Sequence, residues 1–152
     1  NVPCIPGSSI KGAVKAASIL KKVIPDELVR ELFGDDSVGR LQFHDAYPVE
    51  GGVKGYVLIP DVLTPHYSKE GVDTFKEDQA MPIPIPFLSI APATKFRFLI
   101  TDRAQQVDQP FLEILLKAVT VAFSLGLGAK TNLGYGVFDL VKASVTNGEQ
   151  DA

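Results

Sequence analysis

Residues 126–136, GLGAKTNLGYG, hold four glycines in eleven positions, as two Gly-x-Gly pairs around Ala-Lys-Thr-Asn-Leu. An apolar run, FLEILLKAVTVAFSL (111–125), stands before them, and an alternating run, VFDLVKASV (137–145), follows. The first run predicts a mostly buried helix that starts near Pro110 and ends at Gly126, and the second predicts a strand. The glycine-rich stretch therefore connects helix to strand through a backbone that can approach a ligand closely.

The composition is that of an ordinary globular protein, with 152 residues, 45% hydrophobic and 22% charged. This length predicts a single domain over residues 1–147, followed by a polar tail at 148–152. A single cysteine, Cys4, excludes an internal disulfide framework and a multi-cysteine zinc site. The sequence shows no signal peptide and no apolar run of membrane length, so we expect a cytoplasmic protein that binds no cofactor, metal or membrane. Because it begins at Asn1 in the middle of an apparent element, we expect a fragment of a longer protein.

Charge is unevenly distributed along the chain. The formal net charge is −3, but residues 1–25 and 114–138 contain six lysines and no acid, which leaves −9 on the remainder. The two basic segments also contain the serine- and glycine-rich stretches. A basic surface within an acidic protein is therefore predicted, and such a surface suits a polyanionic partner.

The first basic segment reads as an amphipathic helix. Ser8 and Ser9 are suitable N-caps. The predicted apolar face contains Ile10, Ala13, Val14, Ala17 and Leu20, and the predicted polar face contains Lys11, Lys15, Ser18 and Lys22. A helix N-terminus suits a phosphate, so Ser8, Ser9, Lys11 and Lys15 are candidate ligands. The alternative is a well-capped helix with a solvated lysine face.

The middle of the chain reads as short strands. We expect a short helix over 25–34, strands at 39–47 and 55–60, a long loop over 61–83, and a hairpin over 86–100 with its turn near 91–94. The order helix, strands, hairpin, helix, strand predicts an α+β fold. It corresponds to a ferredoxin-like β-α-β-β-α-β unit without its first strand and with a long inserted loop.

The glycine-rich stretch carries a second set of candidate ligands. They are Gly126, Gly128, Gly134 and Gly136 for close backbone approach, Lys130, Thr131 and Asn132 for phosphate and sugar, and Tyr135 for stacking on a base or filling the core. The letters GAKT suggest a Walker A loop, but position 129 is Ala where Gly is required, and position 124 is Ser. Nucleotide hydrolysis is therefore excluded at this stretch. The alternative is a simple helix-to-strand connection.

Catalytic and metal-binding side chains are few. The two histidines are His44 and His66, and His44 stands beside Asp45 in a strand-like run, where sequence neighbours point to opposite faces. They therefore form a poor dyad, and we expect His66 to order the 61–83 loop or meet a partner. The loop acids Asp61, Asp73 and Asp78 have no recognisable ligand spacing.

Several motifs in order resemble a known family. IPGSSIKGAVKAA, LFG, GRLQFHDA and GLGAKTNLGYG resemble the RAMP superfamily of CRISPR-associated proteins, whose C-terminal glycine-rich loop has the spacing found here. DVLTPHY, and PIPIPFLSI ahead of FRF, narrow the resemblance to the family of the sixth subunit of the Cmr (type III-B) effector complex. The resemblance spans residues 3–142.

The resemblance implies a ferredoxin-like, RNA-recognition-like fold. It also implies a non-catalytic subunit for antiviral defence that binds guide RNA near its 3′ end and helps assemble the effector. Its implied partners are the CRISPR guide RNA, other Cmr or RAMP subunits and target RNA. Two alternatives remain open: a RAMP-type endoribonuclease that uses His44 or His66 as general acid or base, and an architectural module that contacts only protein.

Overall fold

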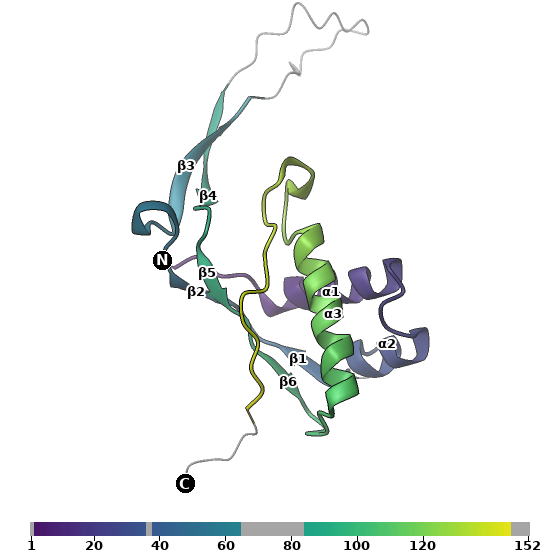
Figure 1. Cartoon of the computed structure of the whole chain (residues 1–152). Helices are drawn as coiled ribbons and strands as arrows, with labels where there is room; N and C mark the ends of the chain where they lie inside the picture. Colours follow the sequence, from purple (N-terminus) through teal and green to yellow (C-terminus); the bar gives the residue numbers. More distant parts are fainter. Residues whose placement is uncertain (1, 36–37, 65–83, 147–152) are drawn as a thin grey trace, which may run out of the picture. The chain divides into compact units, whose positions relative to one another are not determined.

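The computed structural model describes residues 2–35, 38–64 and 84–146, and it shows a mixed α/β protein with small antiparallel sheets (Figure 1). In chain order the elements are α1 (Gly7–Leu20), α2 (Asp26–Phe33), β1 (Leu41–Phe43), β2 (Tyr47–Glu50), the 3₁₀ turn η1 (Val53–Gly55), β3 (Leu58–Leu63), β4 (Ile85–Ile90), β5 (Lys95–Arg97), β6 (Ile100–Asp102), α3 (Gln109–Leu125) and the 3₁₀ turn η3 (Thr131–Leu133). They form two compact units, one from residues 1–47 and 98–152 and the other from residues 48–97. The single domain over 1–147 stays a prediction, and the tail at 148–152 lies outside the described residues.

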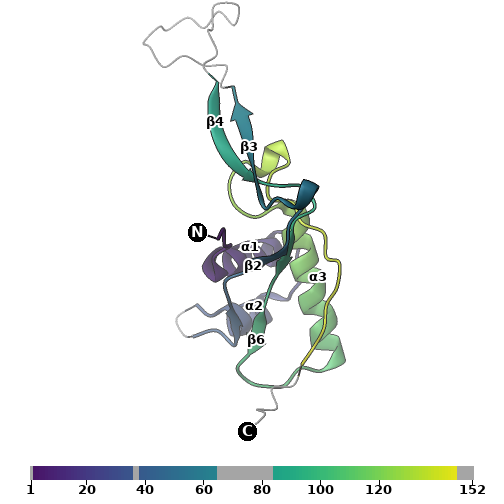
Figure 2. The ribbon, with the colours of Figure 1, turned by 90° about the vertical axis from the view of Figure 1, so that its left-hand side faces the viewer.

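The first unit is built around α1 and α3, which pack side by side (Figures 1 and 2). Ala17 of α1 and Ala118 and Ala122 of α3 are all buried. Phe123 continues the core toward Phe98 and Phe138, whose ring centroids lie 4.5 and 5.9 Å from its own. Helix–helix packing therefore holds this unit together. The prediction that the second helix is mostly buried is wrong, because only Ala118, Val119, Ala122 and Phe123 of α3 are buried.

The two faces of α1 follow the predicted pattern only in part. Ile10, Val14 and Ala17 are buried as expected. Leu20, expected in the core, is exposed, because it is the last residue of the helix. Ser18, expected on the polar face, is fully buried, and its Oγ donates to the main-chain O of Val14 at 2.6 Å. Burial is possible for this serine because the helix itself satisfies its hydroxyl.

The predicted strand at 39–47 forms the two-stranded sheet of this unit. β1 pairs antiparallel with β6 in the register Leu41 to Asp102 and Phe43 to Ile100. Leu41 is buried and Gln42 is exposed, as expected for a strand with one face in the core. Phe43 stacks on Phe33 of α2 with 5.9 Å between ring centroids.

The second unit consists of two short antiparallel ladders. β2 pairs with β5, and β3 pairs with β4 over six residue pairs. The predicted hairpin over 86–100 is therefore wrong in its pairing. A tight turn does occur at 91–94, where Thr94 N donates to Ala91 O at 3.2 Å, but the strands on either side of it pair with β3 and β2 instead of with each other. Local turn residues could not reveal these longer-range partners.

The predicted long loop begins later than expected. Asp61–Leu63 belong to β3, because their partners on β4 extend the ladder through Ile85. Thr64 follows the strand, and residues 65–83, including His66, Asp73 and Asp78, lie outside the described part of the structure.

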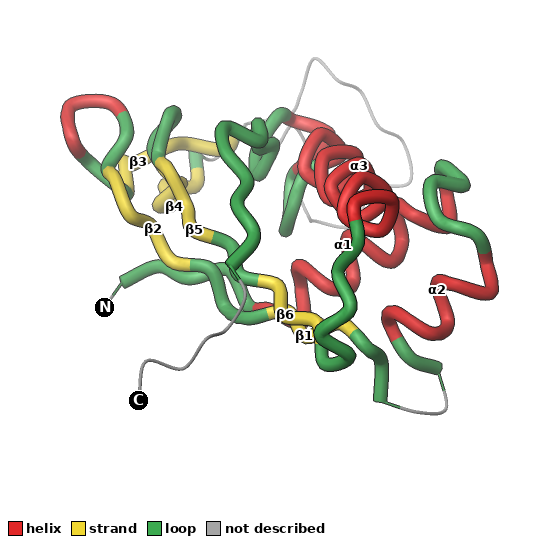
Figure 3. Tube along the Cα trace, turned by 60° about the horizontal axis from the view of Figure 1, so that its bottom comes forward, coloured by secondary structure: helices red, strands yellow, loops and turns green. Residues whose placement is uncertain are grey.

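Residues 137–145 were predicted to form a strand, but in the structure they form a loop (Figure 3). Phe138 anchors it, because its N–H donates to Phe123 O at 3.1 Å and its ring packs on Phe98 and Phe123. The described residues before α1 contribute a single bridge, Ile5 to Ala46, and supply no strand beside 137–145. An alternating segment without a partner strand cannot form a ladder.

Candidate nucleic-acid interface

The first candidate segment is the start of α1, and it is capped differently from the prediction. The N-cap is Pro6, which lies before Ser8 and Ser9, so both serines belong to the first helical turn. The cap comes from another part of the chain: Gly7 N donates to Asp45 Oδ1 at 2.7 Å. A Cβ at Gly7 would stand 2.2 Å from Phe43 O, so the absence of a side chain lets the helix start lie directly against the end of β1.

Little of the backbone at this helix start is left for a ligand. Ser9 N and Ile10 N both donate to Pro6 O, at 2.9 and 3.1 Å. Within the described residues, Ser8 N has no acceptor, and both serine side chains are exposed. The Asp45 carboxylate also places a negative charge near the helix N-terminus. The groups at this site that can donate hydrogen bonds to a phosphate are therefore the main-chain N–H of Ser8 and the hydroxyls of Ser8 and Ser9.

The two candidate lysines of α1 differ in their surroundings. Lys15 Nζ donates to Gly34 O at 3.1 Å, so this ammonium caps the C-terminal end of α2. Lys11 has no hydrogen-bond partner among the described residues and is half-buried. Lys11 can therefore meet a phosphate without giving up an internal contact, whereas Lys15 cannot.

The second candidate segment, residues 126–136, is a closed loop. Gly126 ends α3 with φ of 94°, as predicted for the helix C-terminus. Leu127 N then donates to Gly136 O at 2.8 Å, which joins the two ends of the loop. A Cβ at Gly136 would stand 2.0 Å from Leu127 O, so this approach requires glycine. Leu127 is buried and fixes the base of the loop in the core.

The tip of the loop is a single 3₁₀ turn between two left-handed residues. Lys130, with φ of 63°, precedes η3, and Gly134, with φ of 88°, follows it. Gly128, Lys130, Asn132 and Gly134 are exposed, and Thr131 and Tyr135 are half-buried. Leu133 N donates to Lys130 O at 2.9 Å, which tightens the turn. The loop thus exposes the Lys130 side chain, the Asn132 amide and the glycine main chain, and it contains no acidic residue.

Both segments belong to the first unit. Figures 1 and 2 show the loop beyond the C-terminal end of α3, with α1 alongside the same helix. We expect the two segments to contact the same strand of RNA, which is a prediction that the structure does not test.

The described catalytic candidates have structural partners. His44 Nε2 lies 3.1 Å from Thr101 Oγ1, while Asp45 caps α1, so the two neighbours do not form a dyad. Asp61 Oδ1 accepts from Val62 N at 2.8 Å. The described residues contain no group of three or more His, Cys, Asp or Glu side chains placed to hold a metal ion.

The strongest charge cluster was missed by sequence reasoning. Arg40 Nε and Nη2 donate to the two carboxylate oxygens of Asp102 at 2.7 and 2.8 Å, and Nη2 also donates to Gln106 O. Arg40 lies over the Phe111 ring, with its Cζ 4.7 Å from the ring centroid, and its Nη1 contacts Glu31. The hydrogen bond from Arg40 lowers the pKa of Asp102 to about 2, and the same bond raises the pKa of Arg40. No local pattern marks this cluster, because its two central residues, Arg40 and Asp102, are 62 positions apart.

Comparison with known proteins gives one family. The family model described as RAMP superfamily matches residues 1–139. Cmr6, a subunit of the CRISPR system CMR of Saccharolobus solfataricus, is 36% identical over 146 residues, which cover 95% of this chain and 47% of the relative. The Cmr6 subunit of Pyrococcus furiosus is 31% identical over 124 residues, which cover 76% of this chain and 36% of the relative. The chain therefore spans less than half the length of these relatives.

Solved structures agree with this comparison. A chain in the cryo-EM structure of type III-B Cmr-beta bound to cognate target RNA is 34% identical and has a TM-score of 0.74, with 93% of this chain and 46% of that chain covered. The crystal structure of Cmr6 from Pyrococcus furiosus, at 22% identity, has a TM-score of 0.53 over 90% of this chain and 82% of that chain, which shows a shared fold. Among the described residues, no helix has the length and apolar character needed to cross a membrane.

Proposed function

We propose that this chain, which belongs to the RAMP superfamily, acts in the cytoplasm as an RNA-binding, non-catalytic subunit of a type III-B CRISPR effector complex. It holds the guide RNA near the 3′ end of that RNA and helps to assemble the other subunits for antiviral defence. Its fold is ferredoxin-like, and residues 137–145 become the last strand of that sheet when a first strand lies beside them.

The observation that carries the proposal is the closed loop at residues 126–136. A hydrogen bond between Leu127 and Gly136 joins its ends, and a second, from Leu133 N to Lys130 O, tightens its tip, so fewer loop conformations have to be lost when a ligand binds. The tip exposes Lys130, Asn132 and two glycines and carries no acid. A closed basic loop of this kind suits a phosphodiester backbone, whose recognition depends on cations and main-chain N–H groups and not on base identity.

The start of α1 adds a second, smaller contact. Lys11, Ser8 and Ser9 are available there, while Lys15 remains bound to Gly34. We expect Lys11 and Lys130 to contribute most of the electrostatic attraction to RNA, because neither lies beside an acidic residue in the sequence.

The test is a titration of single-stranded RNAs with the full-length protein and a Lys11→Glu, Lys130→Glu double variant. We expect the variant to bind every RNA sequence at least about tenfold more weakly, and the dependence of log K on log salt to become less steep by about one unit per lysine. Lys142→Glu is the matched control, because it reverses an exposed lysine in the C-terminal segment. Unchanged affinity of the double variant at moderate salt would exclude this RNA surface.

The non-catalytic role needs a separate test. His44 already faces Thr101, which supports a structural role for its imidazole. We expect the wild-type protein, and a variant lacking both His44 and His66, to leave labelled RNA intact over hours. RNA cleavage by the wild-type protein that disappears in the variant would instead establish the endoribonuclease. Cross-linking RNA to the assembled complex, followed by peptide mapping, separates RNA contact from a purely architectural role.

A further inference from the structure

The side chain of Thr131 connects the tip of the glycine-rich loop to its base. A Cβ built on Gly126 would stand 2.6 Å from Cγ2 of Thr131 and 2.9 Å from its Cβ. The threonine methyl therefore occupies the space that a side chain at Gly126 would need. Thr131 is half-buried, whereas its neighbours Lys130 and Asn132 are exposed. The loop thus has a side-chain contact between tip and base, in addition to the main-chain hydrogen bond that joins its ends.

The methyl and the hydroxyl of Thr131 have different surroundings. Cγ2 lies against Gly126, while Oγ1 has no hydrogen-bond partner among the residues that the structure describes. No buried side-chain oxygen in the described part of the chain lacks a partner, so Oγ1 reaches solvent. Threonine is β-branched and stiff at χ1, so contact with the methyl fixes the whole side chain. The methyl is therefore the part of Thr131 that can hold the loop.

The threonine stands where it can control the direction of the neighbouring lysine. Lys130 precedes η3 with a φ of 63°, in the left-handed region. A residue other than glycine stays in that region only where the surrounding structure holds it there. Thr131 is the first residue of η3, directly after Lys130, so its contact with Gly126 restrains the turn that begins at the lysine. Without the methyl, Lys130 could adopt commoner backbone conformations and its ammonium would move.

We propose that Thr131 is a positioning residue for RNA binding: its methyl holds the tip of the loop against Gly126, which keeps Lys130 in the orientation that meets a phosphate. This inference rests on the proposed function, because it requires that the loop bind RNA. It gives Thr131 a role other than the direct contact with phosphate or sugar that the sequence predicted. A loop that adopts the binding arrangement only about a tenth of the time binds about tenfold more weakly.

Two substitutions separate the methyl from the hydroxyl. Thr131→Val keeps both β-branches and removes only the oxygen, whereas Thr131→Ser keeps the oxygen and removes the methyl. Thr120→Ser is the matched control, because it removes the same methyl from an exposed threonine of α3. Each full-length variant is titrated with a fluorescent single-stranded oligouridine. We expect Thr131→Ser to bind about threefold to tenfold more weakly, and Thr131→Val and Thr120→Ser to stay within about twofold of the wild type.

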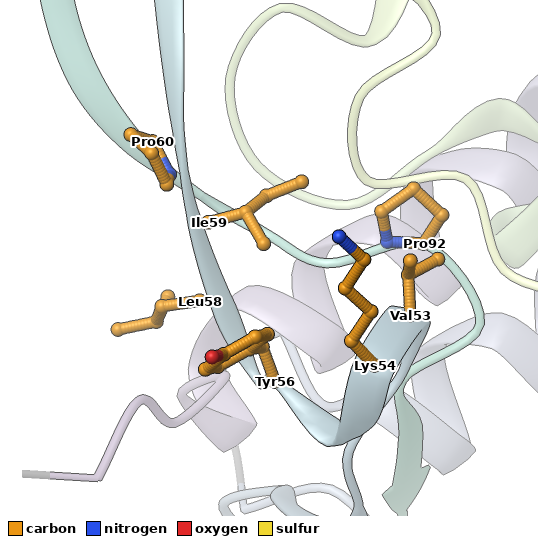
Figure 4. A pocket seen from close by; sticks show the side chains of 7 residues that line it. All are labelled: Val53, Lys54, Tyr56, Leu58, Ile59, Pro60 and Pro92. Atoms are coloured by element: carbon orange, nitrogen blue, oxygen red, sulfur yellow. The ribbon is translucent and has the colours of Figure 1, made fainter.

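A double-mutant cycle tests whether Thr131 acts through Lys130. In a Lys130→Ala background, Thr131→Ser should change affinity by less than about twofold, because the group that it positions is gone. Lys54→Ala is the matched background, because Lys54 is also an exposed, left-handed lysine at a 3₁₀ turn, with φ of 57°. It lies in the second unit, where it lines a pocket with Val53 and Tyr56 (Figure 4). In that background Thr131→Ser should keep its full effect.

Amide hydrogen exchange gives a measurement that needs no RNA. The main-chain N–H of Gly134 donates to Thr131 O at 3.0 Å, so it reports on the turn at the tip. We expect this N–H to exchange several-fold faster in Thr131→Ser than in Thr131→Val or the wild type. Equal exchange rates in the three proteins would overturn the proposal.

The RNA titrations can overturn the proposal in three further ways. Wild-type affinity of Thr131→Ser would show that the methyl is not needed. Weaker binding by Thr131→Val would show that the hydroxyl itself contacts RNA. A full effect of Thr131→Ser in the Lys130→Ala background would show that Thr131 does not act through the lysine. Failure of the wild type to bind RNA would instead count against the proposed function, and the exchange rates would still test the contact between Thr131 and Gly126.

Discussion

The main-chain N–H of Gly7 lies 2.7 Å from Oδ1 of Asp45, so a residue just beyond β1 caps the N-terminus of α1. This bond connects positions 38 residues apart and fixes the orientation of the helix that presents Ser8, Ser9 and Lys11. Its removal should therefore affect stability first and RNA affinity second.

Asp45→Ala should lower the free energy of unfolding by about 0.5–2 kcal/mol, the usual cost of losing an N-cap side chain. Urea unfolding at neutral pH measures this loss. Asp139→Ala, which removes an exposed acid in the C-terminal segment, is the control and should change the free energy by less than about 0.5 kcal/mol. Equal stability of Asp45→Ala and the wild type would show that water replaces the cap at no cost.

Two glycines of α1 should respond in opposite directions to the same substitution. A Cβ at Gly7 meets Phe43 O at 2.2 Å, so Gly7→Ala should destabilise the protein by about 1–3 kcal/mol. A Cβ at Gly12 meets nothing within 4 Å, so Gly12→Ala should stabilise the helix by about 0.5–1 kcal/mol. Thermal unfolding of both variants tests this, and a stabilising Gly7→Ala would contradict the close contact between α1 and β1.

The Arg40–Asp102 pair predicts a specific acid sensitivity. The pKa of Asp102 falls from its ordinary value of 3.8 to about 2 in the folded protein, because Arg40 hydrogen-bonds its carboxylate. As the pH falls, the Asp102 carboxylate is therefore protonated at a higher pH in the unfolded chain than in the folded protein. The stabilisation is complete above the ordinary value and is lost as the pH falls from 3.8 through about 2.

Asp102→Asn should cost about 1–3 kcal/mol at neutral pH, because the Asp102 side chain is 5% exposed and the arginine loses its charged acceptor. The stability difference from the wild type should shrink as the pH approaches 2. Glu31→Gln is the control, because that carboxylate is exposed and its ion pair contributes little. A difference that stays constant between pH 2 and 5 would mean that Asp102 does not titrate in this way.

Sequence patterns predicted where helices and strands occur better than they predicted which strands pair with each other. The helices at α1 and α3, the strand at Leu41–Phe43 and the helix end at Gly126 depend on neighbouring residues, and all occur in the structure. The strands around the 91–94 turn were assigned to each other, because a turn signal carries no information about which strand lies opposite. Pairing depends on long-range contacts, which the local pattern does not contain.

In the candidate site, too, local features could be predicted from the sequence, whereas contacts between distant residues could not. Its basic and glycine-rich segments were visible as composition, and both lie on the first unit. Asp45 as the cap of α1, and Lys15 as the cap of α2, could not be anticipated, because each joins segments that are distant in sequence. Sequence reasoning thus selected candidate groups for RNA contact but did not reveal the internal contacts that already occupy some of them.

Lys11 and Lys15 offer a test of that distinction. Lys15→Ala removes the hydrogen bond to Gly34 O and should lower stability by about 0.5–1.5 kcal/mol. Lys11→Ala should leave stability within about 0.5 kcal/mol and lower RNA affinity instead. Paired unfolding and RNA titrations measure both properties. A stable Lys15→Ala variant with lost RNA affinity would show that the Gly34 bond gives way to a phosphate.

The glycine-rich loop can be tested with two leucines of the same loop. Leu127 is 7% exposed and fixes the base, whereas Leu133 at the tip is 63% exposed. Leu127→Ala should cost about 2–5 kcal/mol through lost burial and a new cavity, while Leu133→Ala should change stability by less than about 0.5 kcal/mol. If the closed loop is what presents Lys130, Leu127→Ala should also weaken RNA binding at temperatures where the rest of the protein remains folded. Unchanged affinity in that variant would show that the tip binds RNA without a fixed base, and the hydrogen bond between Leu127 and Gly136 would then serve stability alone.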